Sequence, residues 1–224
     1  MKLWQIIYSI VYGLMVVAYI FTSTGENFKL RATNKIAMSA SFLTLAFVCF
    51  FLNDDLIFNP WRYLELLAIF LCFLGDVLLL NSFSKGGFAF SLGNLIFFAY
   101  LICYVANAKV SFLHLVWFVV PVVVLVLIDR KFILYKIKKP SLKLKCAGYL
   151  TTVILHGFFS LAVVLVYPTI ETILLAIGLV LFMISDHFLL SGKFVFFGKK
   201  LPQVGVTLTY YPALWLVALS LFFG

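Results

Sequence analysis

The sequence predicts an all-α, polytopic membrane protein in which eight transmembrane helices form a single integral membrane domain over residues 1–224. Of the 224 residues, 65% are hydrophobic and only 11% are charged, whereas a soluble domain carries roughly 25% charged residues. So few charges cannot cover a water-facing surface, which excludes soluble, disordered and fibrous proteins. Phenylalanine is unusually frequent, with 26 residues, as suits helices that face lipid.

Eight apolar runs are long enough to cross a bilayer, which takes about 20 residues. They cover residues 4–22, 34–52, 62–82, 87–107, 111–129, 146–167, 169–191 and 203–223. The loops between them are short, so neighbouring helices are expected to pack antiparallel with no soluble domain between them. The first run is too long for the apolar region of a signal peptide and no small-residue cleavage site follows it, so we expect it to be retained.

The basic residues are divided unevenly between the two ends of the predicted bundle. The loops after the first, third, fifth and seventh runs, with the adjoining helix ends, hold 14 of the 17 Lys and Arg residues: Lys29, Arg31, Lys35, Lys85, Arg130, Lys131, Lys136, Lys138, Lys139, Lys143, Lys145, Lys193, Lys199 and Lys200. Lys2, Arg62 and Lys109 are on the opposite side. Because cytoplasmic loops are rich in Lys and Arg, those four loops are predicted to be cytoplasmic and both termini to lie outside. We therefore expect a multi-pass protein of a cell membrane, most simply a bacterial inner membrane.

The same topological rule accounts for the net charge of +9. Nucleic-acid binding is not expected, because no basic stretch is interleaved with aromatic residues on a soluble module. The segment RKFILYKIKKPSLKLK, residues 130–145, is either a plain topogenic loop or a site that attracts anionic lipid headgroups. No cofactor or metal is predicted, because the four cysteines form no CxxC pair and His156 and His187 lack HxxxH spacing.

A tandem repeat is suggested by two similar segments, FLGDVLLL and FMISDHFLL. An offset of 110 positions relates three pairs of polar residues: Lys35 and Lys145, Asp76 and Asp186, Tyr100 and Tyr210. The offset carries the second, third and fourth runs onto the sixth, seventh and eighth and preserves their orientation. Two tandem four-helix units, arranged as a parallel repeat, would have this pattern.

Two aspartates, Asp76 and Asp186, lie well inside apolar runs, where an ionisable group costs several kcal/mol and by default marks a functional site. From the helical rise, they lie roughly 9 Å and roughly 8 Å from the cytoplasmic ends of their helices. Lys35, Asn94 and the pair Tyr210–Tyr211 fall at a similar depth. The sequence therefore predicts one polar layer in the cytoplasmic leaflet.

Each of these residues also has a structural interpretation. Ser, Tyr or Lys side chains of neighbouring helices can satisfy the two aspartates. Lys35 can extend its ammonium group to the headgroups, and Asn94 can hydrogen-bond between helices. On the other side of the membrane, Glu65 lies one turn inside its run and is expected to pair with Arg62.

The aspartate pair suits acid–base hydrolysis. Two carboxylates at one depth in a low-dielectric medium do not readily ionise together, so one becomes an acid beside a base. Such a pair can catalyse hydrolysis through an oxocarbenium-like state, in which the acid protonates the substrate and the carboxylate steers water. Serine hydrolase chemistry fits poorly, because the sequence has no GxSxG motif.

FLGDVLLL, the later ISDHFLL, Lys35 at the start of its run and the closing TLTYYPALW together resemble the YhhN-type lysoplasmalogenase family over nearly the whole chain. The resemblance implies an eight-helix membrane hydrolase that cleaves the vinyl ether bond of lysoplasmalogens. The products would be a fatty aldehyde and glycerophosphoethanolamine or glycerophosphocholine. By this resemblance Asp76 and Asp186 are the catalytic pair, in either assignment of acid and base. Substrate-binding residues would be Lys35, Asn94, Tyr210 and Tyr211.

The chain departs from the family pattern at three positions. Asn94 stands where the family has a histidine, Ile36 follows the lysine in place of proline, and Leu214 stands where glutamine is expected. Replacement of the histidine and the glutamine bears on substrate choice and on turnover.

Two other functions are consistent with the same residues. A small transporter or lipid-binding protein could use the aspartates in a proton or solute path, although no run is broken at mid-membrane by a Gly/Pro pair. A metal-dependent amidase of the ceramidase type would need more histidines than the three present. The expected partners are a lysophospholipid substrate and the surrounding membrane lipids.

Overall fold

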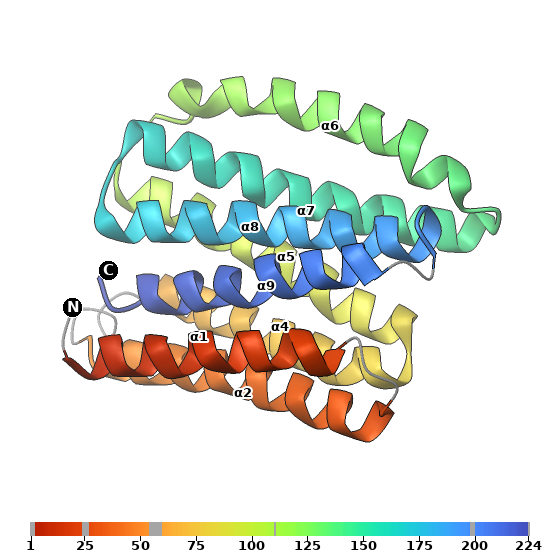
Figure 1. Ribbon diagram of the computed structural model, residues 1–224. Helices are drawn as coiled ribbons and strands as arrows, with labels where there is room; N and C mark the ends of the chain where they lie inside the picture. Colours follow the sequence, from red (N-terminus) through yellow and green to blue (C-terminus); the bar gives the residue numbers. More distant parts are fainter. Residues whose placement is uncertain (1–2, 24–26, 54–59, 110, 198–199, 224) are drawn as a thin grey trace.

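The computed structural model describes residues 3–23, 27–53, 60–109, 111–197 and 200–223, and these residues form helices and no strand (Figure 1). The α-helices are α1 (Leu3–Ser23), α2 (Phe28–Phe51), α4 (Tyr63–Asn81), α5 (Phe83–Asn107), α6 (Val119–Phe132), α7 (Pro140–Val166), α8 (Ile170–Phe194) and α9 (Lys200–Ser220). Three short 3₁₀ helices are η1 (Pro60–Arg62), η2 (Phe112–Phe118) and η3 (Leu134–Lys136). The all-helical prediction is confirmed for these residues.

Six of the helices form a closed ring. Around it, each helix packs against the next in the order α2, α4, α5, α7, α8, α9 and back to α2. Outside the ring, α1 lies against α2 and α9, and α6 lies along α7 at the rim of the molecule (Figure 1). The order α2–α4–α5 in one half matches α7–α8–α9 in the other, while the tandem repeat itself stays a prediction.

Small residues bring α8 and α9 close together. Gly178 of α8 faces the α9 backbone, where a Cβ atom would lie 2.8 Å from the carbonyl oxygen of Ala213. Close approach through glycine and alanine is the usual way in which membrane helices pack, because lipid supplies no hydrophobic drive for their association.

Five segments are long and apolar enough to cross a membrane: α2, η1 with α4, α5, α7 and α8. The first helix contains a shorter apolar stretch, Ile6–Thr22. Membrane character is therefore supported, whereas eight crossings and the sides of the termini remain predictions.

The fifth apolar run, residues 111–129, was expected to be one helix, and this expectation is wrong. Its first part is the 3₁₀ helix η2, and the α-helix covers only Val119–Phe132. Pro121 falls in the first turn of α6, where its missing N–H leaves no helical hydrogen bond unmade. The proline therefore fits the late start of the α-helix.

Two helices begin earlier than their apolar runs. The run at 34–52 belongs to a helix that starts at Phe28, where the side chain of Asn27 accepts a 3.2 Å hydrogen bond from the Leu30 N–H. The run at 146–167 belongs to a helix that starts at Pro140, in the first-turn position that proline favours. Lysines assigned to loops from the sequence thus lie on the first turns of α2 and α7.

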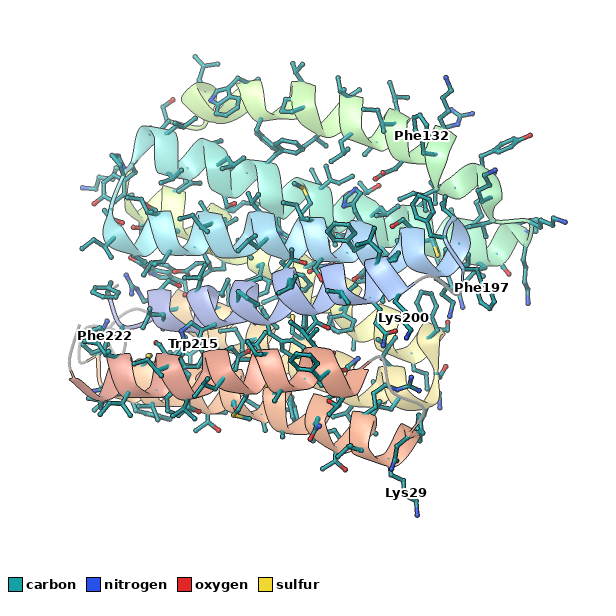
Figure 2. The ribbon with its side chains drawn as sticks, viewed as in Figure 1. Lys29, Phe132, Phe197, Lys200, Trp215 and Phe222 are labelled. Carbon is teal, nitrogen blue, oxygen red and sulfur yellow. The ribbon has the colours of Figure 1, made fainter. Side chains whose placement is uncertain are left out.

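The two ends of the bundle differ. The start of α1 and the end of α9 lie at the same end (Figure 1), where the rings of Trp4 and Phe222 are 6.4 Å apart; we call it the far end. Lys29 and Lys200 lie at the opposite end, with Phe132 and Phe197 (Figure 2). We call that end, where α1, α4, α6 and α8 finish, the basic end.

Candidate active site

Every helix of the ring buries a polar side chain. These residues are Ser39 (α2), Asp76 (α4), Asn94 (α5), His156 (α7), Asp186 (α8) and Tyr210 (α9), and each is at most 4% exposed. Burial of polar groups is costly unless they find partners, so their partners indicate what the ring interior can do.

Asp76 joins three helices. Its Oδ1 lies 3.1 Å from Lys35 Nζ of α2. Its Oδ2 accepts hydrogen bonds from the Ser39 hydroxyl at 2.6 Å and from the Tyr210 hydroxyl of α9 at 2.8 Å. A carboxylate can accept all three contacts, since both of its oxygens are acceptors.

Lys35 and Ser39 reach Asp76 together because they are four residues apart on α2 and so share one helix face. Sequence reasoning identified Lys35 but missed Ser39. The spacing of four residues was a usable signal. Lys35 remains only 15% exposed, since its ammonium group turns inward to the carboxylate.

Asp186 has contrasting surroundings. It is 2% exposed, and its Oδ2 makes no hydrogen bond within the described residues. It interacts electrostatically with Asp76 across the ring. The buried hydroxyl of Tyr149 faces Asp186 but makes no hydrogen bond of ordinary length. The two aspartates therefore share the ring interior, one with three donors and one with an open oxygen.

The remaining predicted residues are placed differently. Both polar atoms of the Asn94 side chain are buried and lack partners in the described chain, so Asn94 does not directly bond either aspartate. Tyr211 faces α1, where its ring packs edge-on to Tyr19 at 5.4 Å and its carbonyl oxygen accepts from the Tyr12 hydroxyl. His156, which the sequence analysis considered only as a metal ligand, has two buried ring nitrogens that also lack partners among the described residues.

A groove opens beside this interior near the basic end. It has a volume of about 730 Å³ and lies between α5 and α7, over the ends of α4 and α8. Leucine and phenylalanine side chains supply most of its wall, with Lys85 and Lys145 among the lining residues. Tyr149, which faces Asp186, also lines it. A volume of this size is in the range of small-molecule sites.

The YhhN family profile matches residues 30–221 of the sequence. The chain belongs to the YhhN family. The match spans α2 to α9 and so includes Lys35, both aspartates and the two late tyrosines. No curated protein and no solved structure matched the chain.

This YhhN-family chain has a second buried charged cluster near the far end. Arg62 Nη2 lies 3.2 Å from Glu171 Oε2 of α8, and the other Glu171 oxygen accepts from the Tyr100 hydroxyl at 3.0 Å. Glu65 accepts from the Ser220 hydroxyl at 2.8 Å. The expected Glu65–Arg62 pair is thus wrong, because Arg62 lies in the 3₁₀ turn and reaches across to α8.

His187 ties the outlying helix α6 to the ring. Its Nε2 is 2.9 Å from Asp129 Oδ2 of α6, and its Nδ1 is 2.7 Å from the Met183 carbonyl oxygen. It is thus an interface histidine. Across the described part of the chain, no group of three or more His, Cys, Asp or Glu side chains is placed to hold a metal ion.

Proposed function

We propose that this protein is a membrane hydrolase that cleaves the vinyl ether bond of lysoplasmalogen, or of a related lysolipid, with Asp76 and Asp186 as base and acid. Family membership supports lysoplasmalogenase-type chemistry in general. The observation that carries the assignment is the contrast between two buried carboxyl groups in one ring. Asp76 has three donors, whereas Asp186 has an oxygen without a partner.

This contrast assigns the roles in the proposal. Asp76, held by an ammonium group and two hydroxyls, is the ionised partner. Asp186 is the proton donor, because an open, desolvated oxygen next to another carboxylate is better carried as a neutral acid. The sequence alone left either assignment open.

The proposed reaction proceeds in three steps. Asp186 protonates the outer vinyl carbon, and the adjacent ether carbon becomes an oxocarbenium ion that the Asp76 carboxylate stabilises. Water adds to this carbon and gives one proton to Asp76. The hemiacetal then collapses: its hydroxyl proton passes to Asp186 and Asp76 protonates the departing glycerol oxygen. The aldehyde leaves, and both carboxyl groups return to their starting states.

The orientation is part of the proposal. We place the basic end at the cytoplasmic face of a cell membrane, with eight crossings and both termini outside, because cytoplasmic loops collect Lys and Arg. The aspartates then lie in the cytoplasmic leaflet, where a lysophospholipid can reach them from the surrounding membrane lipids.

The test is aldehyde release from purified protein given lysoplasmenylethanolamine, compared with its saturated 1-O-alkyl analogue. The first lipid should yield one aldehyde per headgroup product and the analogue none, because it has no vinyl carbon to protonate. No aldehyde from the vinyl ether lipid would refute the specific assignment.

A proton-coupled transporter remains the second candidate. The observation in its favour is the cluster at the far end, which with the aspartates gives α4 a buried carboxyl group, Glu65 or Asp76, near each end. Proton-coupled solute uptake into proteoliposomes, lost in Asp76→Asn and without any lysolipid hydrolysis by the unaltered chain, would favour transport.

A further inference from the structure

We propose that the groove between α5 and α7 holds the hydrocarbon chain of a single-chain phospholipid, whose phosphate lies at Lys85 and Lys145. The proposal rests on the proposed function, for which the groove is the substrate's binding site. It extends that function, because it places the hydrocarbon chain and the phosphate on residues outside the predicted catalytic and substrate-binding residues. None of these groove residues binds Asp76.

Two glycines contribute open space to the groove. Gly87 of α5 and Gly148 of α7 both line it, and a Cβ atom added to either would meet nothing within 4 Å. By contrast, a Cβ on Gly86, the neighbour of Gly87, would lie 2.9 Å from Leu79. Of these two neighbouring glycines, only Gly87 therefore has open space at its Cβ position, and it is the one that lines the groove.

Charge at the mouth matches a lysolipid headgroup. Lys85 and Lys145 line the groove near the basic end, and none of the described residues that line it is acidic. Both lysines are exposed, and Lys145 Nζ reaches across from α7 to the Ser84 hydroxyl of α5 at 3.3 Å. Two ammonium groups above an apolar channel are complementary to a phosphate joined to one hydrocarbon chain.

Two aromatic side chains connect the groove with the aspartates. Tyr149 lines the groove, and its buried hydroxyl interacts with Asp186, the candidate acid. Phe90 lines it as well, and its ring lies 6.0 Å from that of Tyr210, which binds Asp76. Tyr149 is therefore placed between the groove and Asp186, where the linkage between the hydrocarbon chain and the headgroup would lie.

The length of the groove favours a lipid with one hydrocarbon chain. Along α5 the lining residues run from Phe83 to Leu95, about 18 Å of helix. A lipid with two chains would have to leave one of them outside the groove. We therefore commit to a lysophospholipid as the occupant, and a two-chain bilayer lipid becomes an outcome that the test can reveal.

The binding test uses Asp186→Asn, so that it does not depend on turnover. The full-length protein is photolabelled with 1-O-alkyl lysophosphatidylethanolamine bearing a diazirine in its chain, and in parallel with a two-chain phosphatidylethanolamine carrying the same group. Lysolipid label should appear on peptides containing residues 84–95 and 142–152. Equal labelling there by both lipids, or lysolipid label mainly elsewhere, would overturn the proposal.

The blocking test fills the groove. Gly87→Phe and Gly148→Phe should each lower lysolipid labelling in the Asp186→Asn background by about tenfold. Gly13→Phe is the matched control, because Gly13 on α1 also faces open space but away from the groove. Folded Phe variants that label as strongly as the parent protein would refute the groove. Should a Phe variant not fold, Gly87→Leu gives the same comparison with less bulk.

The charge test separates the phosphate site from the chain site. Replacement of Lys85 or Lys145 by Gln should weaken lysolipid binding by about fivefold each, and Lys138→Gln, another exposed lysine of the basic end, should not. Lysolipid binding that is unchanged in all three variants would overturn the assignment of the phosphate to Lys85 and Lys145. Labelling at the groove without aldehyde release by the unaltered protein would refute the proposed function and leave this inference standing. Aldehyde release that Gly87→Phe leaves unaffected would refute the groove as the binding site and leave the proposed function standing.

Discussion

The Tyr210 hydroxyl donates a 2.8 Å hydrogen bond to Asp76 Oδ2, although the two residues are 134 positions apart. Ser39 donates to the same oxygen, and Lys35 pairs with the other. Asp76 is thus both a candidate base and the junction of α2, α4 and α9. Asp186 has an Oδ2 without a hydrogen-bond partner among the described residues. We therefore expect its substitution to affect mainly the reaction, and substitution of Asp76 to affect both the reaction and the stability of the fold.

The first prediction concerns the two aspartates. Asp186→Asn should lower aldehyde release by about 10²-fold or more, the usual loss on removing a general acid, while the thermal unfolding midpoint changes little. Asp76→Asn should lose both activity and stability, because the substitution breaks an ion pair between helices. Aldehyde release and unfolding are measured on the same preparations.

Asp129→Asn is the control for this pair. Asp129 is equally buried, at 3% exposure, but bonds His187 outside the ring interior. It should keep its rate of aldehyde release per folded molecule. Full activity in Asp186→Asn would contradict its role as acid.

The second prediction is that Tyr210→Phe lowers kcat by roughly 10- to 100-fold and leaves KM nearly unchanged. Hydrogen bonds to charged groups contribute about 1.5–3 kcal/mol, and this one holds the base without touching the substrate. Tyr100→Phe is a matched control, since it removes a hydroxyl that bonds the Glu171 carboxyl group at the far end. An effect on KM alone would instead place Tyr210 against the substrate.

The third prediction concerns Asn94, whose side chain has no hydrogen-bond partner among the residues that the structure describes. Its amide is free to hold a water or a polar atom of the substrate, so the unaltered protein should turn over and Asn94→Leu should be impaired. Asn94→His should give no large gain, because the two carboxyl groups already supply an acid and a base. Aldehyde release is measured from about pH 5 to about pH 9, where histidine changes charge. A large gain confined to histidine would show that this chain lacks an obligatory acid or base.

The fourth prediction is that Arg62→Met destabilises the fold by about 3–5 kcal/mol, since it leaves Glu171 buried without its cation. The thermal unfolding midpoint in detergent should fall clearly. Lys109→Met, an exposed cation near the same end, should leave it in place. Unchanged unfolding of Arg62→Met would mean that the far-end cluster contributes little to stability.

The depth of each polar residue along the bundle could be predicted from the sequence, because the rise per residue of an α-helix is fixed. Counting residues from the basic end placed Asp76, Lys35 and Tyr210 at one level, and these three side chains do meet. The neighbour that each side chain points towards could not be predicted, since it depends on which helices lie side by side in the ring. Tyr211, one residue after Tyr210, is turned by about 100° and faces α1 instead.

Other features depended on packing that no short pattern encodes. The groove is lined by two glycines far apart in sequence, Gly87 and Gly148, and a Cβ atom added to either would meet nothing within 4 Å. Glu65 appeared close enough to Arg62 for a helical ion pair, but the 3₁₀ turn at Pro60–Arg62 sends the guanidinium to Glu171. The segment 111–129 was predicted to be one helical span. In the structure its first part is a 3₁₀ helix, and the α-helix with Pro121 in its first turn begins only at Val119.

The contact between Trp4 and Phe222 brings the start of α1 close to the end of α9. The order in which the helices are synthesised could therefore be changed without changing how they pack. Because α1 starts where α9 finishes, a short linker could join them and the chain could be reopened at Lys109, between α5 and α6. Each half then keeps four helices, and each helix would keep its original direction along the bundle. A circular permutant beginning at α6 should therefore assemble the same ring, with the second half of the protein translated first.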